Sequence, residues 1–541
     1  MLREYISDLK REFSGYKKYS LVTDLLSGIT VAAVALPLAL AFGVSSGADA
    51  AAGLITAIAS SFIIGALSGA SYQISGPTGA MAAILIPLAV KHGFHTILMA
   101  GMLSGIILIA AGVIKAGRIT SFLPKSVITG FTSGIALIIA LGQIENFLGV
   151  QSHGEESYMR IINMIKDGFT PNFYSIGYGL FVILLMVSWP KKWAKRVPAS
   201  LVAVIIATGV EIIADFPVAT VGAIPRTLIH SVRLSPASIL NTRLDTVIMP
   251  AISIAALCMI ESLLCGAVAG KMKGERLRGD RELVAQGIGN ILLPFLGGVP
   301  ATAAIARTSV AIKSGAGTRL AGIFQGVTLL LSMFLLSPFM SRIPMAALSG
   351  VLIVTAWRMN EWEGIKYIFK NKFKSAILQF LITLICTVLF DLTISIAVGC
   401  LISMLLYVIK VSNLEVTVSD FDPARLNKSI RFTEHVQVIY ITGSIFFASA
   451  DCFAEKAKDA SGEILLLSMR GVPEVDASGA QELLDFCKDK MNNGTGVLFC
   501  GVQPKVKSFF DRAGITDFIG EDNFYWEAAE AFLSLDSTID S

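Results

Sequence analysis

The chain has 541 residues, of which 54% are hydrophobic and 16% are charged, and its mean hydropathy is +0.69. Soluble proteins carry about 25% charged residues, so this composition excludes an ordinary soluble protein and indicates a chain that uses lipid as its solvent. The net charge of +4 is too small to indicate a nucleic-acid partner.

The first 23 residues form a charged segment. Residues 1–20 mix basic and acidic side chains and hold no apolar run of the signal-peptide kind. The first apolar run starts after Asp24 and continues as a full membrane span. Thr23 and Asp24 are therefore interpreted as the N-cap of the first membrane helix.

Apolar runs between residues 24 and 412 predict fourteen membrane crossings, because a helix needs about 20 apolar residues to cross a bilayer. Two of these runs are short and begin at a Pro or Gly, at 76–90 and 300–313. The other predicted spans are 24–46, 49–69, 95–115, 125–144, 172–189, 198–215, 246–270, 282–297, 319–339, 343–357, 374–390 and 391–412.

Lys and Arg cluster in alternate loops, for example at 191–196 and 271–281, whereas the opposite loops hold few. This bias agrees with the positive-inside rule only if both short runs cross the membrane or pair with a crossing. It places the N-terminus and the C-terminal tail on the cytoplasmic side of the plasma (inner) membrane.

The membrane part, 24–412, contains an internal repeat. Pro77 and Pro300 open the two short runs and lie 223 residues apart, and Pro124 and Pro344 lie 220 apart. The first copy covers about 24–215 and the second about 246–412. Each copy has seven predicted crossings, an odd number, so the two must have opposite topology. The predicted fold is an α-helical seven-plus-seven inverted repeat with two half-helices.

The two half-helices predict an anion site near the middle of the membrane. A broken helix leaves backbone N–H groups free at its N-terminus, where the helix dipole adds partial positive charge. In hydrocarbon an anion is their natural partner. Two ordinary kinked helices are the alternative. Small residues let a ligand approach the backbone in both runs: Thr78, Gly79 and Ala80, and Ala301, Thr302 and Ala303.

Two charged residues lie within predicted spans. Glu261 is in mid-span, where a carboxylate is costly unless it is paired, protonated or facing water, so we expect it to be able to bind a proton at neutral pH. The alternative is a structural hydrogen bond between helices. Arg307 is expected about two turns, roughly 10 Å, inward of Pro300, where it could attract an anion. Its alternative is snorkelling toward the cytoplasmic surface.

After Val411 the chain becomes polar, and 413–541 reads as one cytosolic α/β domain. Expected strands are Val436–Thr442, Ile464–Ser468 and Gly496–Cys500; expected helices are Ala450–Lys458, Ala477–Met491, Pro504–Ala513 and Trp526–Leu535. The seven scattered cysteines are interpreted as reduced and non-ligating.

The chain resembles the SulP family of anion permeases, solute carrier family 26, in its bacterial branch of bicarbonate and dicarboxylate transporters. The resemblance is carried by 36–43 (LPLALAFG) and 300–308 (PATAAIART). It implies core and gate domains and a substrate site between the two short spans, 76–90 and 300–313 (spans 3 and 10 in chain order). Span 1, at 24–46, and span 8, at 246–270, are implied to lie beside this site. Phe42 is the span 1 residue expected there. It also implies that Arg307 lines the anion pocket and that Glu261 couples transport to H⁺ or Na⁺.

The tail is similar to the STAS domain that ends SulP proteins, most clearly at 475–480 (VDASGA). Ser478 falls where anti-sigma factor antagonists are phosphorylated, so it is a candidate regulatory residue. The alternative is an exposed residue at a helix start.

These observations predict a secondary active transporter of sulfate, bicarbonate or a small dicarboxylate, working by alternating access. Its expected partners are the anion, H⁺ or Na⁺, the bilayer and a second copy in a homodimer. Alternatives are an uncoupled anion channel or exchanger, or an anion sensor that signals through the STAS domain. The sequence shows no metal cluster, cofactor site, phosphate loop or nucleophile–base pair, so we expect no enzyme activity and no cofactor.

Overall fold

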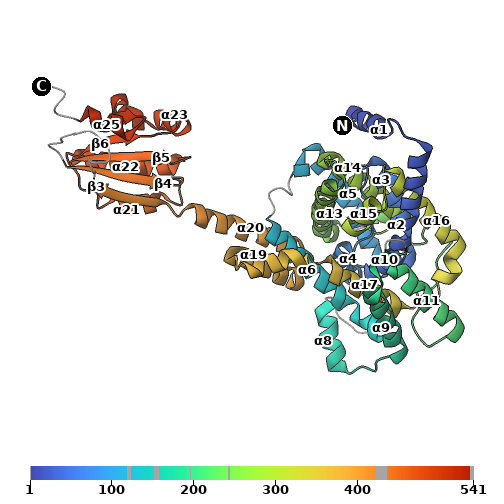
Figure 1. The fold of residues 1–541 in the computed structure, drawn as a ribbon. Helices are drawn as coiled ribbons and strands as arrows, with labels where there is room; N and C mark the ends of the chain where they lie inside the picture. Colours follow the sequence, from blue (N-terminus) through green and yellow to red (C-terminus); the bar gives the residue numbers. More distant parts are fainter. Residues whose placement is uncertain are drawn as a thin grey trace. The chain divides into compact units, whose positions relative to one another are not determined.

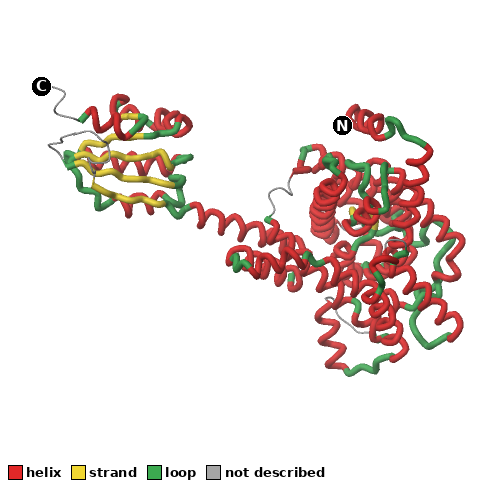
Figure 2. Tube along the Cα trace, viewed as in Figure 1, coloured by secondary structure: helices red, strands yellow, loops and turns green. Residues whose placement is uncertain are grey.

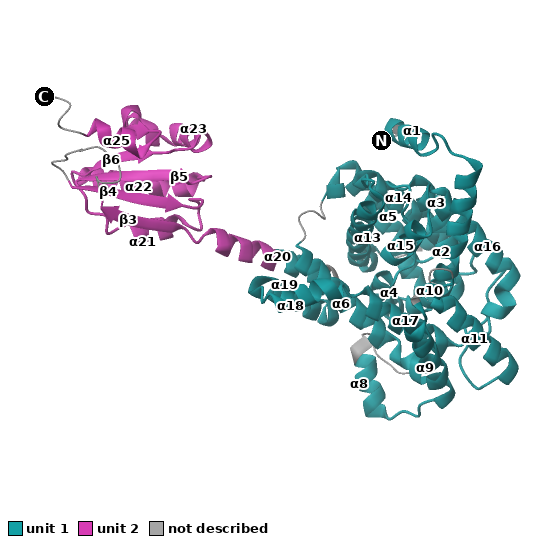
Figure 3. Ribbon diagram, in the orientation of Figure 1, with its two compact units in different colours: residues 1–400 teal, residues 401–541 magenta. Residues whose placement is uncertain are grey.

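A computed structural model describes residues 2–118, 124–150, 157–194, 197–241, 244–390, 392–420 and 435–535. The chain divides into two compact units, residues 1–400 and residues 401–541 (Figure 3). The first unit is almost entirely helical, and the second contains a β-sheet (Figure 2). The division falls within α20 (Leu392–Val411).

Each of the fourteen predicted spans coincides with one helix (Figure 1). Among the described residues, seven helices are long and apolar enough to cross a membrane. The number of crossings stays a prediction. With α20, the helices are α2 (Lys18–Ser45), α3 (Ala50–Leu67), α4 (Gly79–His92), α5 (Phe94–Val113), α6 (Lys125–Gly142), α9 (Phe173–Ser188), α11 (Ala199–Ala214), α13 (Leu244–Lys273), α14 (Gly279–Leu296), α15 (Ile305–Lys313), α16 (Leu320–Met340), α17 (Met345–Met359) and α19 (Lys374–Leu389). Shorter helices between them are α7 (Ile144–Leu148), α8 (Ser157–Asp167), α10 (Lys191–Ala194), α12 (Pro236–Asn241) and α18 (Trp362–Lys370).

The helix packing of the first unit has the pattern of two equivalent copies. The fourth helix of the first copy, α5, packs on the second helix of the second copy, α14, and the reciprocal pair α3 and α16 also packs. The same exchange relates α6 on α19 to α9 on α17. Reciprocal contacts of this kind follow from a pseudo-two-fold relation between the copies.

The helices α5 and α14 cross at close range because glycine faces glycine. A Cβ added to Gly105 would lie 2.6 Å from the carbonyl oxygen of Gly287, and a Cβ on Gly287 would lie 2.6 Å from that of Gly105. Such small-residue contacts are how membrane helices gain close packing without a hydrophobic driving force.

A two-stranded antiparallel sheet joins the two copies at the centre of the first unit. Strand β1 (Ser75–Gly76) precedes α4, and β2 (Thr302–Ala303) precedes α15. Ser75 is opposite Ala303, and Gly76 is opposite Thr302. The pairing supplies backbone partners to extended segments that lipid could not satisfy.

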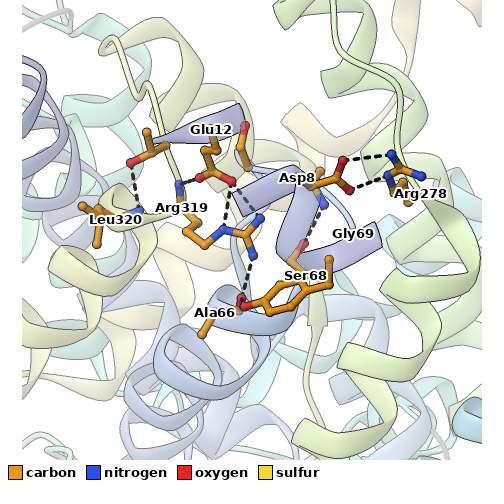
Figure 4. Close-up of polar contacts among 12 residues, drawn as sticks. Asp8, Glu12, Ala66, Ser68, Gly69, Arg278, Arg319 and Leu320 are labelled. Atoms are coloured by element: carbon orange, nitrogen blue, oxygen red, sulfur yellow. Dashed lines mark hydrogen bonds and ion pairs between the residues drawn. The ribbon is translucent and has the colours of Figure 1, made fainter. Parts of the chain in front are cut away.

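Ion pairs hold the amino-terminal helix α1 (Leu2–Glu12) against the starts of α14 and α16 (Figure 4). Glu12 pairs with Arg319, which precedes α16, at 2.8 Å, and both side chains are less than 10% exposed. Arg319 also donates to the carbonyl of Ala66 in α3 at 2.6 Å.

Asp8 provides the second attachment of α1 (Figure 4), pairing with Arg278 at 2.5 Å and with Arg281 at 2.7 Å where α14 begins. Burial raises the pKa of Asp8, but hydrogen bonds from Arg281 and Arg278 outweigh burial and hold it below its ordinary value. The carboxylate therefore stays ionised at neutral pH, and α1 ties together the starts of α14 and α16.

The expectation that Thr23 and Asp24 cap the first membrane helix was wrong. The helix α2 begins at Lys18, so both residues lie within it. Asp24 is fully buried and accepts hydrogen bonds from the backbone of Gly317 and the hydroxyl of Thr318, both at 2.6 Å. It therefore anchors the loop before α16, a partner almost 300 residues away that local sequence did not indicate.

The second unit is one five-stranded sheet in the order β3-β4-β5-β6-β7, with β3 antiparallel to β4 and the remaining pairs parallel. The strands are β3 (Glu415–Asp420), β4 (Val436–Thr442), β5 (Ile464–Gly471), β6 (Gly496–Cys500) and β7 (Phe524–Tyr525). The helices are α21 (Ala450–Ala457), α22 (Ala477–Asn492), α23 (Pro504–Ala513), α24 (Ile515–Ile519) and α25 (Ala528–Ser534). The three expected strands and four expected helices are confirmed, whereas the edge strands β3 and β7 were missed.

Candidate functional site

The two half-helices start close to the β1–β2 pairing. The helix α4 begins at Gly79 with Thr78 as its N-cap, and α15 begins at Ile305. The second short run was expected to be helical from Pro300, but no helix is assigned over 300–304, which contains β2. Pairing with β1 keeps this stretch extended, so the break is longer than the sequence indicated.

Arg307 therefore lies in the first turn of α15 and not two turns beyond the break. It is 1% exposed, and its Nη2 donates to the carbonyl of Pro77 at 2.6 Å. Gly76 leaves room for the guanidinium, since a Cβ there would lie 2.3 Å from Nη1. Nη1 itself is buried and has no hydrogen-bond partner among the described residues. The snorkelling alternative does not fit a side chain buried against Pro77.

Glu261 of α13 contacts Thr78, the residue that follows Pro77. It is partly buried, and its Oε2 accepts a hydrogen bond from the Thr78 hydroxyl at 3.0 Å. That hydroxyl also accepts from the backbone N–H of Met81 at 3.3 Å, which caps α4. A carboxyl group and a guanidinium thus bind consecutive residues, Thr78 and Pro77, at the start of one half-helix.

Phe42 lies beside Gly79, because a Cβ added to that glycine would be 3.0 Å from the Phe42 ring. A small pocket opens between α2, α4 and α6 at this place. It is lined by Phe42, Ser45, Gly79, Ala82, Ala83, Ile86, Ile138, Ile139, Gly142 and Gln143. The structure therefore brings Phe42, Thr78, Gly79, Glu261 and Arg307 together.

The small residues of the second run have a different setting. Ala301, Thr302 and Ala303 are fully buried, and Ala80 of the first run is 2% exposed. The Thr302 hydroxyl is 3.0 Å from that of Ser262 on α13, and Ala303 pairs with β1. The residues of the second run thus lie at the pairing of β1 with β2. The contact of the small residues with an anion stays a prediction.

Ser478 lies in the second unit, exposed in the first turn of α22. Asp476 caps this helix by accepting from the backbone N–H of Gly479 at 2.8 Å, and it also accepts from that of Phe447 at 3.1 Å. The exposed hydroxyl fits both the regulatory prediction and its alternative, so the regulatory role stays a prediction.

Three buried polar residues near the β1–β2 pairing were not predicted from the sequence. Glu282, Gln286 and Asn290 of α14 are all fully buried. Their spacing of four residues places them on one helix face, and a polar stripe within a membrane span was the signal that could have found them.

Metal-binding side chains are not grouped near this site. Within the described ranges, no cluster of three or more His, Cys, Asp or Glu residues could hold a metal ion. All seven cysteines are free thiols. The groups that the described residues bring together at the site are one guanidinium, one carboxyl group, hydroxyls and backbone N–H groups.

Comparison with known proteins identifies both units. Residues 21–386 match the family model described as the Sulfate permease family, and residues 427–531 match the STAS domain. A putative sulfate transporter, YvdB of Bacillus subtilis, is 33% identical over 95% of this chain and 97% of its own length. The bicarbonate transporter BicA of Picosynechococcus is 26% identical over 94% of this chain and 93% of its own length.

Two solved structures share the fold. The murine Solute Carrier 26 family member A9 anion transporter, in its inward-facing state, covers 96% of this chain and 92% of its own with a TM-score of 0.84 at 18% identity. The transmembrane domain of a cyanobacterial BicA covers 71% of this chain and 98% of its own with a TM-score of 0.64 at 27% identity.

Proposed function

Because the chain belongs to the sulfate permease family, we propose that it is a secondary active transporter of a small anion, coupled to H⁺ or Na⁺ and working by alternating access. The candidate anions are sulfate, bicarbonate and a small dicarboxylate. Relatives named as a putative sulfate transporter and as a bicarbonate transporter support the first two. The proposed setting is the plasma membrane, with both termini cytoplasmic and the chain in a homodimer.

One observation carries the proposal: the buried Nη1 of Arg307, which has no hydrogen-bond partner among the described residues. A buried charged donor without a partner is strongly unfavourable, so it indicates that a ligand completes the site. Arg307 lies in the first turn of α15 and hydrogen-bonds to Pro77, two residues before α4 begins. Both half-helix N-termini are therefore close to the guanidinium and add partial positive charge. An anion satisfies all three features at once.

Glu261 supplies the proposed coupling. The carboxyl group and the Arg307 guanidinium bind neighbouring residues, so an ionised Glu261 offsets the positive charge that the anion needs. A proton or a sodium ion on Glu261 removes this competition. Anion and coupling ion should therefore bind cooperatively, each raising the affinity of the other by the same factor.

Reconstitution in proteoliposomes tests the function. Purified protein would be given radiolabelled sulfate, bicarbonate or succinate under an inward H⁺ gradient, an inward Na⁺ gradient, or neither. We expect one anion to accumulate above its external concentration under one of the two gradients. Uptake that only equilibrates, whatever the gradient, would indicate a channel or exchanger, and absence of uptake of all three would reject the proposal.

A further inference from the structure

The helix α14 carries a ladder of three amide and carboxyl side chains, Glu282, Gln286 and Asn290, which is not part of the anion site described above. The three residues are spaced four apart and have no exposed surface. Polar groups buried within a membrane unit are costly unless they are hydrogen-bonded. The partners of each residue therefore show what the ladder holds.

Asn290 binds the backbone just before β2 through both of its polar atoms. Its Nδ2 donates to the carbonyl of Ala301 at 2.9 Å, and its Oδ1 accepts from the N–H of Ala301 at 2.7 Å. An amide side chain meets both groups of one residue in this way as a neighbouring strand would. The stretch before β2 is therefore fixed by α14 as well as by β1.

Gln286 binds the first residue of β1, and Glu282 binds the chain just after α3. Gln286 Nε2 donates to the hydroxyl of Ser75 at 2.8 Å and to Glu282 Oε1 at 2.8 Å. Glu282 Oε2 accepts from the hydroxyl of Ser68 at 2.6 Å and from the N–H of Gly69 at 2.8 Å. One face of α14 thus binds extended segments from both copies of the repeat.

This arrangement matters because β1 and β2 are only two residues long. Strand pairs this short are not stable alone. Yet β1 leads within three residues to the start of α4, and β2 leads within two residues to the start of α15. We propose that the ladder of Glu282, Gln286 and Asn290 positions both half-helix N-termini for anion binding; this role rests on the transport function proposed above.

Asn290→Asp tests the ladder at its most specific contact. A protonated Asp can donate to the Ala301 carbonyl and accept from the Ala301 N–H, as Asn does, whereas an ionised Asp loses the donor and faces the carbonyl with negative charge. Among the described residues, the titratable side chain in contact with Asn290 is Cys258 on α13, at 3.7 Å, and Glu282 lies two turns along α14. Asn290→Leu removes both bonds at every pH.

Two readouts separate positioning from general stability. The first is the KM for whichever of sulfate, bicarbonate and succinate the wild type accumulates, measured from pH 5 to pH 9 and expressed as a ratio of variant to wild type. The second is hydrogen–deuterium exchange of segments 73–78 and 299–304 in the purified full chain, which does not depend on transport. Asn371→Asp, at an exposed site whose Nδ2 donates to the carbonyl of Tyr367 four residues earlier, is the matched control.

We expect Asn290→Leu to raise KM at least tenfold and to raise exchange in both segments. For Asn290→Asp the KM ratio should be close to one in acid and rise at least tenfold toward alkaline pH, with the control unchanged. If the Leu variant does not fold, the Asp variant decides alone.

A KM ratio for Asn290→Asp that does not rise with pH, or faster exchange with an unchanged KM, overturns the ladder role. A wild type that accumulates none of the three anions instead rejects the proposed function, while exchange still reports whether the ladder holds the segments.

Discussion

Replacing Arg307 with Met tests the anion site most directly, because Met keeps an unbranched apolar stem but lacks the whole guanidinium, with its charge and its donors. Two losses follow from the structure. The Pro77 carbonyl loses a donor 2.6 Å away, and the anion loses the free Nη1. An unsatisfied buried carbonyl costs about 1–3 kcal/mol, so the variant should be less stable yet still fold.

The loss of anion affinity can be bounded from both sides. A hydrogen bond from a charged donor contributes about 1.5–3 kcal/mol, which corresponds to roughly a tenfold to hundredfold rise in Kd. A full charge about 4 Å from the anion, at an effective dielectric constant near 20, contributes about 4 kcal/mol, or roughly a thousandfold. Arg307→Lys keeps the charge but has no second planar donor, so its affinity should lie between wild type and Met.

The assay is anion-dependent stabilisation of purified protein against heat, titrated with sulfate, bicarbonate and succinate in turn, followed by uptake in proteoliposomes. Arg342→Met is the control, because Arg342 forms a surface pair with Asp215 in which the side chains are 55% and 78% exposed. The reasoning is refuted if Arg307→Met stays folded and binds the anion within threefold of wild type.

Three further predictions concern coupling, the second unit and α1. Glu261→Gln mimics the protonated carboxyl group, so it should bind the anion with weakened pH dependence yet fail to accumulate it under an H⁺ gradient; accumulation equal to wild type under both gradients would make Glu261 a structural residue. If Na⁺ is the coupling ion, the same variant should lose sodium stimulation. Truncation after Val411 should lower expression or rate but leave anion selectivity unchanged, and a changed order of preference in competition uptake would show that the second unit contributes to the site. Glu12→Gln should lower the melting temperature, because removing one partner of a buried ion pair costs about 3–5 kcal/mol. The control Lys10→Gln, at an exposed position of α1, should leave the melting temperature unchanged. Equal melting temperatures for the two variants would show that the pair with Arg319 does not hold α1.

One test suggested by the sequence alone is unsuitable in the structure. Bulky replacements at Ala301 or Thr302 look like a way to block an anion path, since both are small residues at a helix break. Both are fully buried, and Ala301 uses its backbone N–H and carbonyl to bind Asn290. Tryptophan there would disrupt packing before it could report on transport, so the charge at Arg307 is the better probe.

The sequence by itself determined the helix positions, the repeat and the two breaks, because these depend on local properties. Apolar runs of membrane length read directly as helices, and Pro77 and Pro300 mark interruptions that occur at the same place in both copies. Alternating strand and helix patterns likewise predicted the central strands of the second unit. The edge strand β7 has only two residues, too few for a period to show.

Only the tertiary structure decided which atoms meet at the site. The pairing of β1 with β2 keeps residues before Ile305 out of the helix, and this moves Arg307 into the first turn beside Pro77. The hydrogen bonds of Asp24 and Asn290 likewise come from partners that local periodicity does not reveal. A buried polar group in a membrane protein must find a hydrogen-bond partner wherever the fold brings one, so its role is set by contacts across the chain and not by its neighbours in sequence.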